Sequence, residues 1–246
     1  MEPNRDGDVD ISGTAKLLAD PGRARMLTVL ADGRAQPAGE LARAAGVSAA
    51  TASEHLGKMV DQGWLEVERQ GRHRYFRIAV PEVVQALELL AVISPVTPVR
   101  SLRGSRAQRD LKVARSCYDH LAGAVGVALF DGLRDAELLN MTGGEWTATE
   151  RPHPVLSALA IAPADLHGFG RRPPVKACLD WSERRYHLAG GFGALLLTRM
   201  FDHHWCEHGK TSRAVAFTTK GWRNLEAHLD IDSSAILGSV ADSKSA

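Results

Sequence analysis

The stretch "SAATASEHLGKMVDQGWLE", from Ser48 to Glu66, decides how the first third of the chain folds. Its first half carries small and hydroxyl-bearing residues, whereas its second half is more apolar and ends near Gly63. Serine is a residue type that caps the N-termini of helices. The preceding stretch "PAGELARAAG" has proline at the start of a helix and Gly46 at its end. Two short helices joined by a three-residue turn that contains Gly46 predict a helix-turn-helix.

The second helix of such a motif enters the major groove of DNA by its N-terminal end, which explains the composition of this stretch. Hydroxyl side chains can hydrogen-bond to base edges, alanines can touch thymine methyl groups, and His or Lys can reach phosphates. Glu54 could accept from cytosine, but we favour an orientation away from the groove. The DNA contacts predicted from this helix are Ser48, Ala49, Ala50, Thr51, Ser53, His55 and Lys58.

A basic hairpin is expected directly after this helix, in "GWLEVERQGRHRYFRIAV". Two strand-forming segments flank the turn "RQGRHR", and residues 69–77 hold four Arg and one His without an acidic residue. A hairpin of this kind is either a solvated surface element or a wing that contacts phosphates or the minor groove. Its position after a helix-turn-helix favours the wing. The wing residues expected on DNA are Arg69, Arg72, His73 and Arg74.

The stretch "LADPGRARMLTVLADG…GELARAAGVSAATASEHLGKMVDQGWLEVERQGRHRYFRI" resembles the ArsR/SmtB family of winged-helix repressors. The resemblance implies an ArsR-type DNA-binding domain, which we place at residues 11–94. It also implies a homodimer on a pseudo-palindromic operator, with "PEVVQALELLAVI" as the dimer helix and Val84, Leu87 and Ile93 among its apolar positions. Members of the family release DNA when an effector binds.

The chain departs from the family at its known metal sites. Arsenic-sensing members carry a Cys-x-Cys type site in the first helix of the motif, and here "PAGELARAA" has neither Cys nor His. Zinc-sensing members carry Asp and His pairs on the last helix, and "PEVVQALELLAVI" has none. An effector, if there is one, is therefore expected to act through the rest of the chain.

Bulk composition sets the remaining limits. A length of 246 residues fits one large or two smaller domains, and a net charge of +1 does not by itself indicate nucleic acid. Three widely spaced Cys without a signal peptide predict a cytoplasmic protein without a disulfide framework. No apolar run approaches the roughly 18 residues of a membrane helix.

A basic linker is expected at residues 95–110, followed by a C-terminal domain at residues 111–232 that contains an internal repeat. "CYDHLAGAVGVALFDGL" starts at Cys117 and "CLDWSERRYHLAGGFGALLLTRM" starts at Cys178, with six extra residues in the second copy. Each copy is expected to run helix, strand, helix, which predicts two degenerate winged-helix-like repeats. The fold class is thus mainly α with small β-hairpins (α+β). The two signatures resemble the extra domain of a longer ArsR-type subgroup.

The C-terminal domain offers three candidate features. If the repeats begin as helices, Cys117 and His120 lie on one helix face, whereas Cys178 and His187 are nine residues apart and out of phase, so the two pairs cannot be equivalent metal sites. The two Cys could still meet across a pseudo-twofold axis. Between a thiol or metal sensor and simple buried packing, we favour packing. An effector pocket between the copies is expected to use Tyr118, His120, Trp181, Tyr186, His187 and Phe192. A metal site is a further possibility at His204, Cys206 and His208, because residues 204 and 208 have i, i+4 spacing.

These observations predict a sequence-specific DNA-binding transcriptional regulator, an effector-released repressor that acts as a homodimer. No cofactor is certain, and a metal ion or small molecule is a possible effector. We find no motif of an enzyme active site. The alternatives are a DNA-targeted enzyme with its chemistry in the C-terminal domain, and an architectural DNA binder without an effector.

Overall fold

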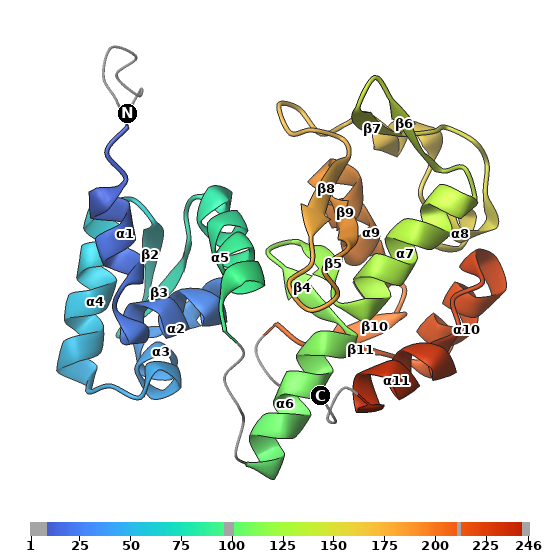
Figure 1. Cartoon of the computed structure of the whole chain (residues 1–246). Helices are drawn as coiled ribbons and strands as arrows, with labels where there is room; N and C mark the ends of the chain where they lie inside the picture. Colours follow the sequence, from blue (N-terminus) through green and yellow to red (C-terminus); the bar gives the residue numbers. More distant parts are fainter. Residues whose placement is uncertain (1–8, 96–100, 211–212, 243–246) are drawn as a thin grey trace. The chain divides into compact units, whose positions relative to one another are not determined.

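The predicted helix-turn-helix forms in the computed structural model, which describes residues 9–95, 101–210 and 213–242 (Figure 1). Helix α3 (Ala38–Ala45) ends at Gly46, whose φ of 70° lies in the left-handed region that favours glycine. Helix α4 (Ala49–Asp61) begins after Ser48, whose hydroxyl accepts a hydrogen bond from the backbone N–H of Thr51. The cap and the glycine therefore fix the turn between the two helices.

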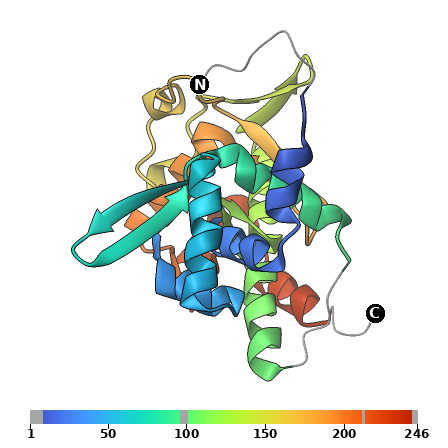
Figure 2. The same cartoon turned by 90° about the vertical axis from the view of Figure 1, so that its left-hand side faces the viewer.

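The other elements of the first unit complete a winged helix. Helix α2 (Pro21–Leu30) is capped by Asp20, and its apolar face meets α3 and α4. The sheet is antiparallel, in the order β1-β3-β2, and the β2–β3 hairpin extends away from the helices in Figure 2. These elements are α1 (Ser12–Leu18), β1 (Gln36–Pro37), β2 (Leu65–Gln70), β3 (His73–Ile78) and the first residues, up to Val84, of α5 (Pro81–Ile93). The buried apolar side chains include Met26, Leu27, Leu30, Leu41, Leu56 and Met59.

The boundary between the two compact units differs from the expected one. The first unit ends at Val84 and the second begins at Gln85, so the division lies within α5 and not after residue 94. Helix α6 (Leu102–Val113) includes residues 102–110 of the expected linker and the first three residues of the expected C-terminal domain, while residues 96–100 lie outside the described residues. At the other end, helix α11 (Ser233–Asp242) continues beyond the expected limit at residue 232.

The second unit repeats the order hairpin, helix, hairpin, helix. The first copy comprises β4 (Arg115–Cys117), β5 (His120–Ala122), α7 (Ala124–Asp135), β6 (Leu139–Thr142), β7 (Glu145–Ala148) and α8 (Pro154–Ala158). The second copy comprises β8 (Lys176–Leu179), β9 (Tyr186–Ala189), α9 (Gly190–Asp202), β10 (Cys206–His208), β11 (Val215–Phe217) and α10 (Thr219–Leu229). A short 3-10 helix, η1 (Pro163–Leu166), lies between the copies. The α+β class with small hairpins is confirmed.

The prediction that each copy begins with a helix is wrong. Each copy begins with an antiparallel hairpin, and its helix starts only at or after the glycine of the "HLAG" motif. Gly123 has a φ of 83° and Gly190 a φ of 85°, a conformation that L side chains rarely adopt, and it turns the chain from strand to helix. The alanine and leucine content of the following segment hid this junction in the sequence.

The two copies pack against each other reciprocally. Helix α7 of the first copy contacts β9 of the second, and α9 of the second contacts β5 of the first. At equivalent positions of the two helices, a Cβ atom on Gly126 or Gly193 would lie 2.6 Å from the carbonyl oxygen of Leu121 or Leu188, respectively. Only glycine allows each helix to lie this close to the preceding strand of its own copy. The same Cβ atoms would also lie 3.6 Å from Cβ of His187 and 3.2 Å from Cβ of His120, respectively, each on the hairpin of the other copy.

Within the described residues, none of the helices combines the length and apolar character needed to cross a membrane.

Candidate functional site

The N-terminal end of α4 presents the small residues predicted to face DNA. Ser48, Ala49 and Ala50 are exposed, and the Ser48 and Thr51 hydroxyl oxygens lie 2.9 Å apart. The first backbone N–H groups of α4 point out of this end, which favours a phosphate oxygen. The geometry therefore allows hydroxyl donors, methyl groups and backbone N–H groups to approach one surface.

The hairpin tip presents the predicted wing residues. Arg69, Arg72, His73 and Arg74 are all exposed, and β2 pairs with β3 up to Gln70 and His73. A guanidinium N–H of Arg74 donates to the Ser53 hydroxyl oxygen at 3.2 Å, which links the wing to α4. Positive charge on the wing is thus held beside the helix that would read bases.

Two of the side chains predicted to reach phosphate have partners inside the first unit. His55 is buried, and its Nε2 lies 3.4 Å from a carboxylate oxygen of Asp20. The prediction of a phosphate contact by His55 is wrong, because this ring connects α4 to the start of α2. Lys58 is exposed but donates to Glu54 at 2.7 Å, an i, i+4 pair.

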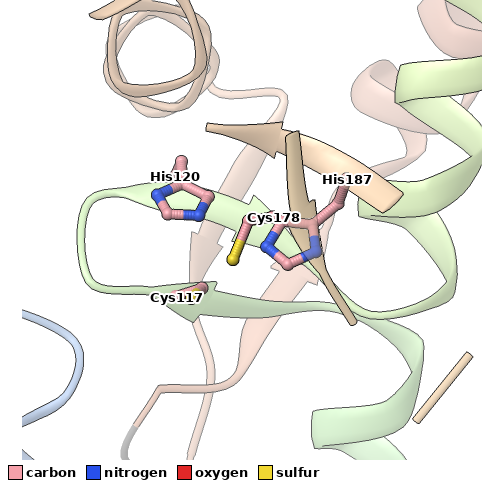
Figure 3. A group of neighbouring side chains, drawn as sticks. All are labelled: Cys117, His120, Cys178 and His187. Atoms are coloured by element: carbon pink, nitrogen blue, oxygen red, sulfur yellow. The ribbon is translucent and has the colours of Figure 1, made fainter. Parts of the chain in front are cut away.

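A second site lies where the two hairpins of the second unit meet. Cys117, His120, Cys178 and His187 each offer a ligand atom, and these four atoms lie within 4.8 Å of one another (Figure 3). Cys117 stands directly opposite His120 in the β4–β5 hairpin, and Cys178 directly opposite His187 in the β8–β9 hairpin. Residues opposite each other on antiparallel strands point to the same face, so each hairpin presents one thiol and one imidazole.

The Cys and His of each pair are brought together by strand pairing and not by the spacing of residues on a helix. The six extra residues from Trp181 to Tyr186 lengthen the second hairpin without changing the pairing of its Cys and His. The two Cys of the repeat do meet, with their sulfur atoms within 4.8 Å of each other.

Each copy also supplies an aspartate beside its histidine. A carboxylate oxygen of Asp119 lies 3.3 Å from Nδ1 of His120, and one of Asp180 lies 3.6 Å from Nδ1 of His187. Arg172 binds Asp119, and Arg115 binds Asp180 at 3.0 Å. The two aspartates hold corresponding positions in the repeated Cys-x-Asp motif, so the carboxylates recur with the ligands.

Burial and charge set the protonation of this cluster. The neighbouring Cys178 sulfur and burial raise the pKa of the Cys117 thiol to about 11, while the same contact lowers the pKa of Cys178. Burial opposes the charged form of Asp119, but His120 and Arg172 prevail and lower its pKa to about 2. The two thiols therefore differ, and Cys178 is the one that gives up its proton more readily.

Arg115 is a core residue of the second unit. It is fully buried and stacks over Trp181, with 4.5 Å between the guanidinium carbon and the ring centroid. It binds both Asp180 and Glu88, at 3.0 and 3.5 Å. Because its side chain is enclosed in this way, Arg115 cannot contact DNA.

The predicted effector pocket is not assembled from its six residues. His120 and His187 do come together, with ring centroids 5.2 Å apart. Phe192 is part of the apolar core, whereas Tyr186 is 53% exposed. A separate cleft of about 520 Å³ borders β7 and β8 and includes Trp146 and His167, and none of the six predicted residues lines it.

The metal site predicted at His204, Cys206 and His208 assumed that these residues lie on a helix, and this assumption is wrong. Helix α9 ends at Asp202, and residues 206–208 form strand β10, so the i, i+4 helical spacing does not exist. Cys206 is buried, and burial raises the pKa of its thiol to about 12. Among the described residues, the group able to hold a metal is the one formed by both hairpins.

Comparison with known proteins gives the family context. The helix-turn-helix domain family matches residues 18–68. The "Uncharacterized HTH-type transcriptional regulator YdfF" of Bacillus subtilis (strain 168) is 38% identical over 231 residues, which cover 94% of this chain and 99% of that protein.

Solved structures with similarity to the chain cover a smaller part of it. NolR from Sinorhizobium fredii is 26% identical over 35% of this chain and 85% of its own, with a TM-score of 0.32. The homodimeric winged helix-turn-helix domain Mb0332 from Mycobacterium bovis, a possible ArsR-family regulator, is 29% identical over 36% of this chain and 88% of its own, with a TM-score of 0.31.

Proposed function

Since the chain belongs to the family of HTH-type transcriptional regulators that includes YdfF, with a first unit of the ArsR/SmtB winged-helix type, we propose that it is a homodimeric repressor released from DNA by an effector. The N-terminal end of α4 reads bases in the major groove, and the wing holds the backbone of the duplex.

The observation that carries this proposal is the surface formed by α4 and the wing. Exposed small residues at Ser48 to Ala50 stand at the start of the helix, and exposed arginines stand on the hairpin that Arg74 joins to Ser53. The combination supplies both kinds of contact that a specific complex needs: short groups for base edges and cations for phosphates.

The homodimer is supported by apolar side chains that remain exposed on α5. Leu89, Leu90 and Ile93 are 58%, 42% and 79% exposed, and their spacing places them near one side of the helix. Val84, one of the positions that the sequence favoured, is buried in the chain itself. A second copy that covers the exposed residues would present two recognition helices to a pseudo-palindromic operator.

The test separates base reading from phosphate binding with two variants of the full chain. Arg72→Ala should weaken binding to every sequence by a similar factor and reduce the salt slope by about 0.9. Thr51→Ala keeps the Ser48 cap and should lower the preference for the operator over random DNA. Arg151→Ala, an exposed arginine of the second unit, is the matched control. If Arg72→Ala and Thr51→Ala act alike on all sequences, α4 is not the reading helix.

A further inference from the structure

We propose that Cys117, His120, Cys178 and His187 bind one thiophilic divalent cation, zinc(II) by their chemistry, between the two hairpins of the second unit. The inference concerns a cation site outside the winged helix and stands independently of DNA binding.

The geometry of the four residues is close to what zinc requires. Two thiolates and two imidazoles in a tetrahedron form a common zinc site, in which ligand atoms lie about 3.3–3.8 Å apart at the usual bond lengths. The four candidate ligand atoms already lie within 4.8 Å of one another, so small side-chain rotations would close the site. The two pairs come from separate hairpins, which hold their backbones in strand register.

Buried nitrogen atoms at the cluster have unmet bonding capacity. His120 and His187 are 6% and 0% exposed, and Nε2 of His120 and both ring nitrogens of His187 have no hydrogen-bond partner. A buried polar atom without a partner costs stability, and native proteins rarely tolerate two at one place. A cation that accepts both lone pairs removes this cost.

Asp119 orients the imidazole of His120 for this role. Histidine ligands commonly donate their second ring N–H to a carboxylate, which fixes the tautomer. Asp119 lies 3.3 Å from Nδ1 of His120, so the proton is favoured on Nδ1 and the lone pair on Nε2. The Asp180 carboxylate lies 3.6 Å from Nδ1 of His187, beyond hydrogen-bond distance, so either nitrogen of His187 can carry the lone pair. Both copies of the repeat thus carry a thiol, an imidazole and a nearby carboxylate.

The charges balance when a divalent cation is bound. Two thiolates neutralise the 2+ charge, and the aspartates are already paired with Arg172 and Arg115. No net charge is then buried, which avoids the large desolvation cost of an unpaired ion. Thiolate and imidazole ligands select zinc-like ions over magnesium or calcium, which prefer oxygen.

A cation can reach the site from the surface of the second unit. Cys178 is partly exposed, and it lines a cavity of about 110 Å³ together with His120 and Glu88. Since the protein supplies all four ligands, no position is left open for substrate, and the bound ion would join the two copies of the repeat.

The experiment uses the full-length chain, purified under reducing conditions and stripped with a chelator. We expect it to bind one Co²⁺ per chain, with the intense visible bands of tetrahedral cobalt and a thiolate-to-cobalt charge-transfer band, and one Zn²⁺ should displace the cobalt. Loss of a carboxylate that hydrogen-bonds a metal ligand weakens metal binding roughly 10–100-fold. Cys117→Ser and Cys178→Ser each remove a ligand itself, so each should weaken metal binding by a larger factor. Cys206→Ser, a buried thiol outside the cluster, should bind metal like the wild type.

Thiol alkylation of the unsubstituted chain tests the same site without any substitution, so it remains informative if a variant does not fold. Zinc should slow alkylation of Cys178 at least tenfold relative to the stripped chain, while the rate at Cys206 should not change. The proposal is overturned if the reduced chain binds cobalt only with the weak spectrum of an octahedral ion. It is equally overturned if Cys117 and Cys178 form a reversible disulfide and the reduced thiols take no metal.

Discussion

Replacing Asp180 by Asn tests whether the buried charges hold the two repeats together. The carboxylate of Asp180 is inaccessible to solvent and accepts hydrogen bonds from Arg115 at 3.0 Å, from the backbone N–H of Gly123 at 2.7 Å and from the hydroxyl of Ser182 at 2.7 Å. It thereby ties the second copy of the repeat to the first turn of α7 in the first copy. Asparagine would keep an acceptor but remove the charge opposite a fully buried guanidinium.

The expected cost follows from what remains around Arg115. Breaking a buried ion pair costs about 3–5 kcal/mol. Glu88 stays 3.5 Å from Arg115, so we expect the lower end, about 3 kcal/mol. With a urea m-value of about 2–3 kcal/mol per molar, the midpoint of the second unit should fall by about 1 M or more.

Urea unfolding followed by tryptophan fluorescence measures this change, because Trp205 is fully buried and Trp181 stacks on Arg115 within the second unit. Asp135→Asn is the control: its carboxylate also pairs with an arginine but is 69% exposed, so it should cost less than about 1 kcal/mol. Equal midpoints for the two variants would refute the view that this network stabilises the unit.

Three further variants test other parts of the molecule. His55→Ala should lower the free energy of unfolding of the first unit by about 1–2 kcal/mol, because His55 is buried against Asp20. At temperatures where the chain is folded, its DNA affinity in an electrophoretic mobility shift assay should be unchanged. A loss of affinity in the folded variant would contradict the structural role of His55. Asp119→Asn should weaken zinc binding about 10–100-fold in competition with a chromophoric chelator, with Tm of the stripped chain little changed. Ile93→Glu should shift the chain to monomers in analytical ultracentrifugation, and an unchanged mass would place the dimer interface elsewhere.

The helix-turn-helix was predictable because its signals are local. Gly46 needs a left-handed conformation, Ser48 caps the following helix, and the basic turn of the wing separates two strand-forming segments. Each of these features acts within a few residues of the chain, so single residues identify them. His55 was misjudged because its burial depends on Asp20, which is distant in sequence.

The metal cluster could be predicted only in part. The repeat pointed to corresponding Cys and His residues, but the apolar segment after Gly123 was extended backwards into a helix that does not exist. Two residues, Tyr118 and Asp119, connect Cys117 to His120, and Gly123 follows the second strand. This pattern is the signal for a hairpin that the assumed helical spacing concealed. That the two hairpins face each other follows from packing of α7 and α9 across the copies, which no local pattern contains.

The most direct test of the central claim is the affinity of the full-length protein for the DNA upstream of its own gene, against random DNA of equal length, at two salt concentrations. The account predicts that the upstream DNA binds at least about 10³-fold more tightly and that both affinities fall with salt. Equal affinity for both DNAs at both salt concentrations would contradict a sequence-specific regulator that reads its operator through α4 and the wing.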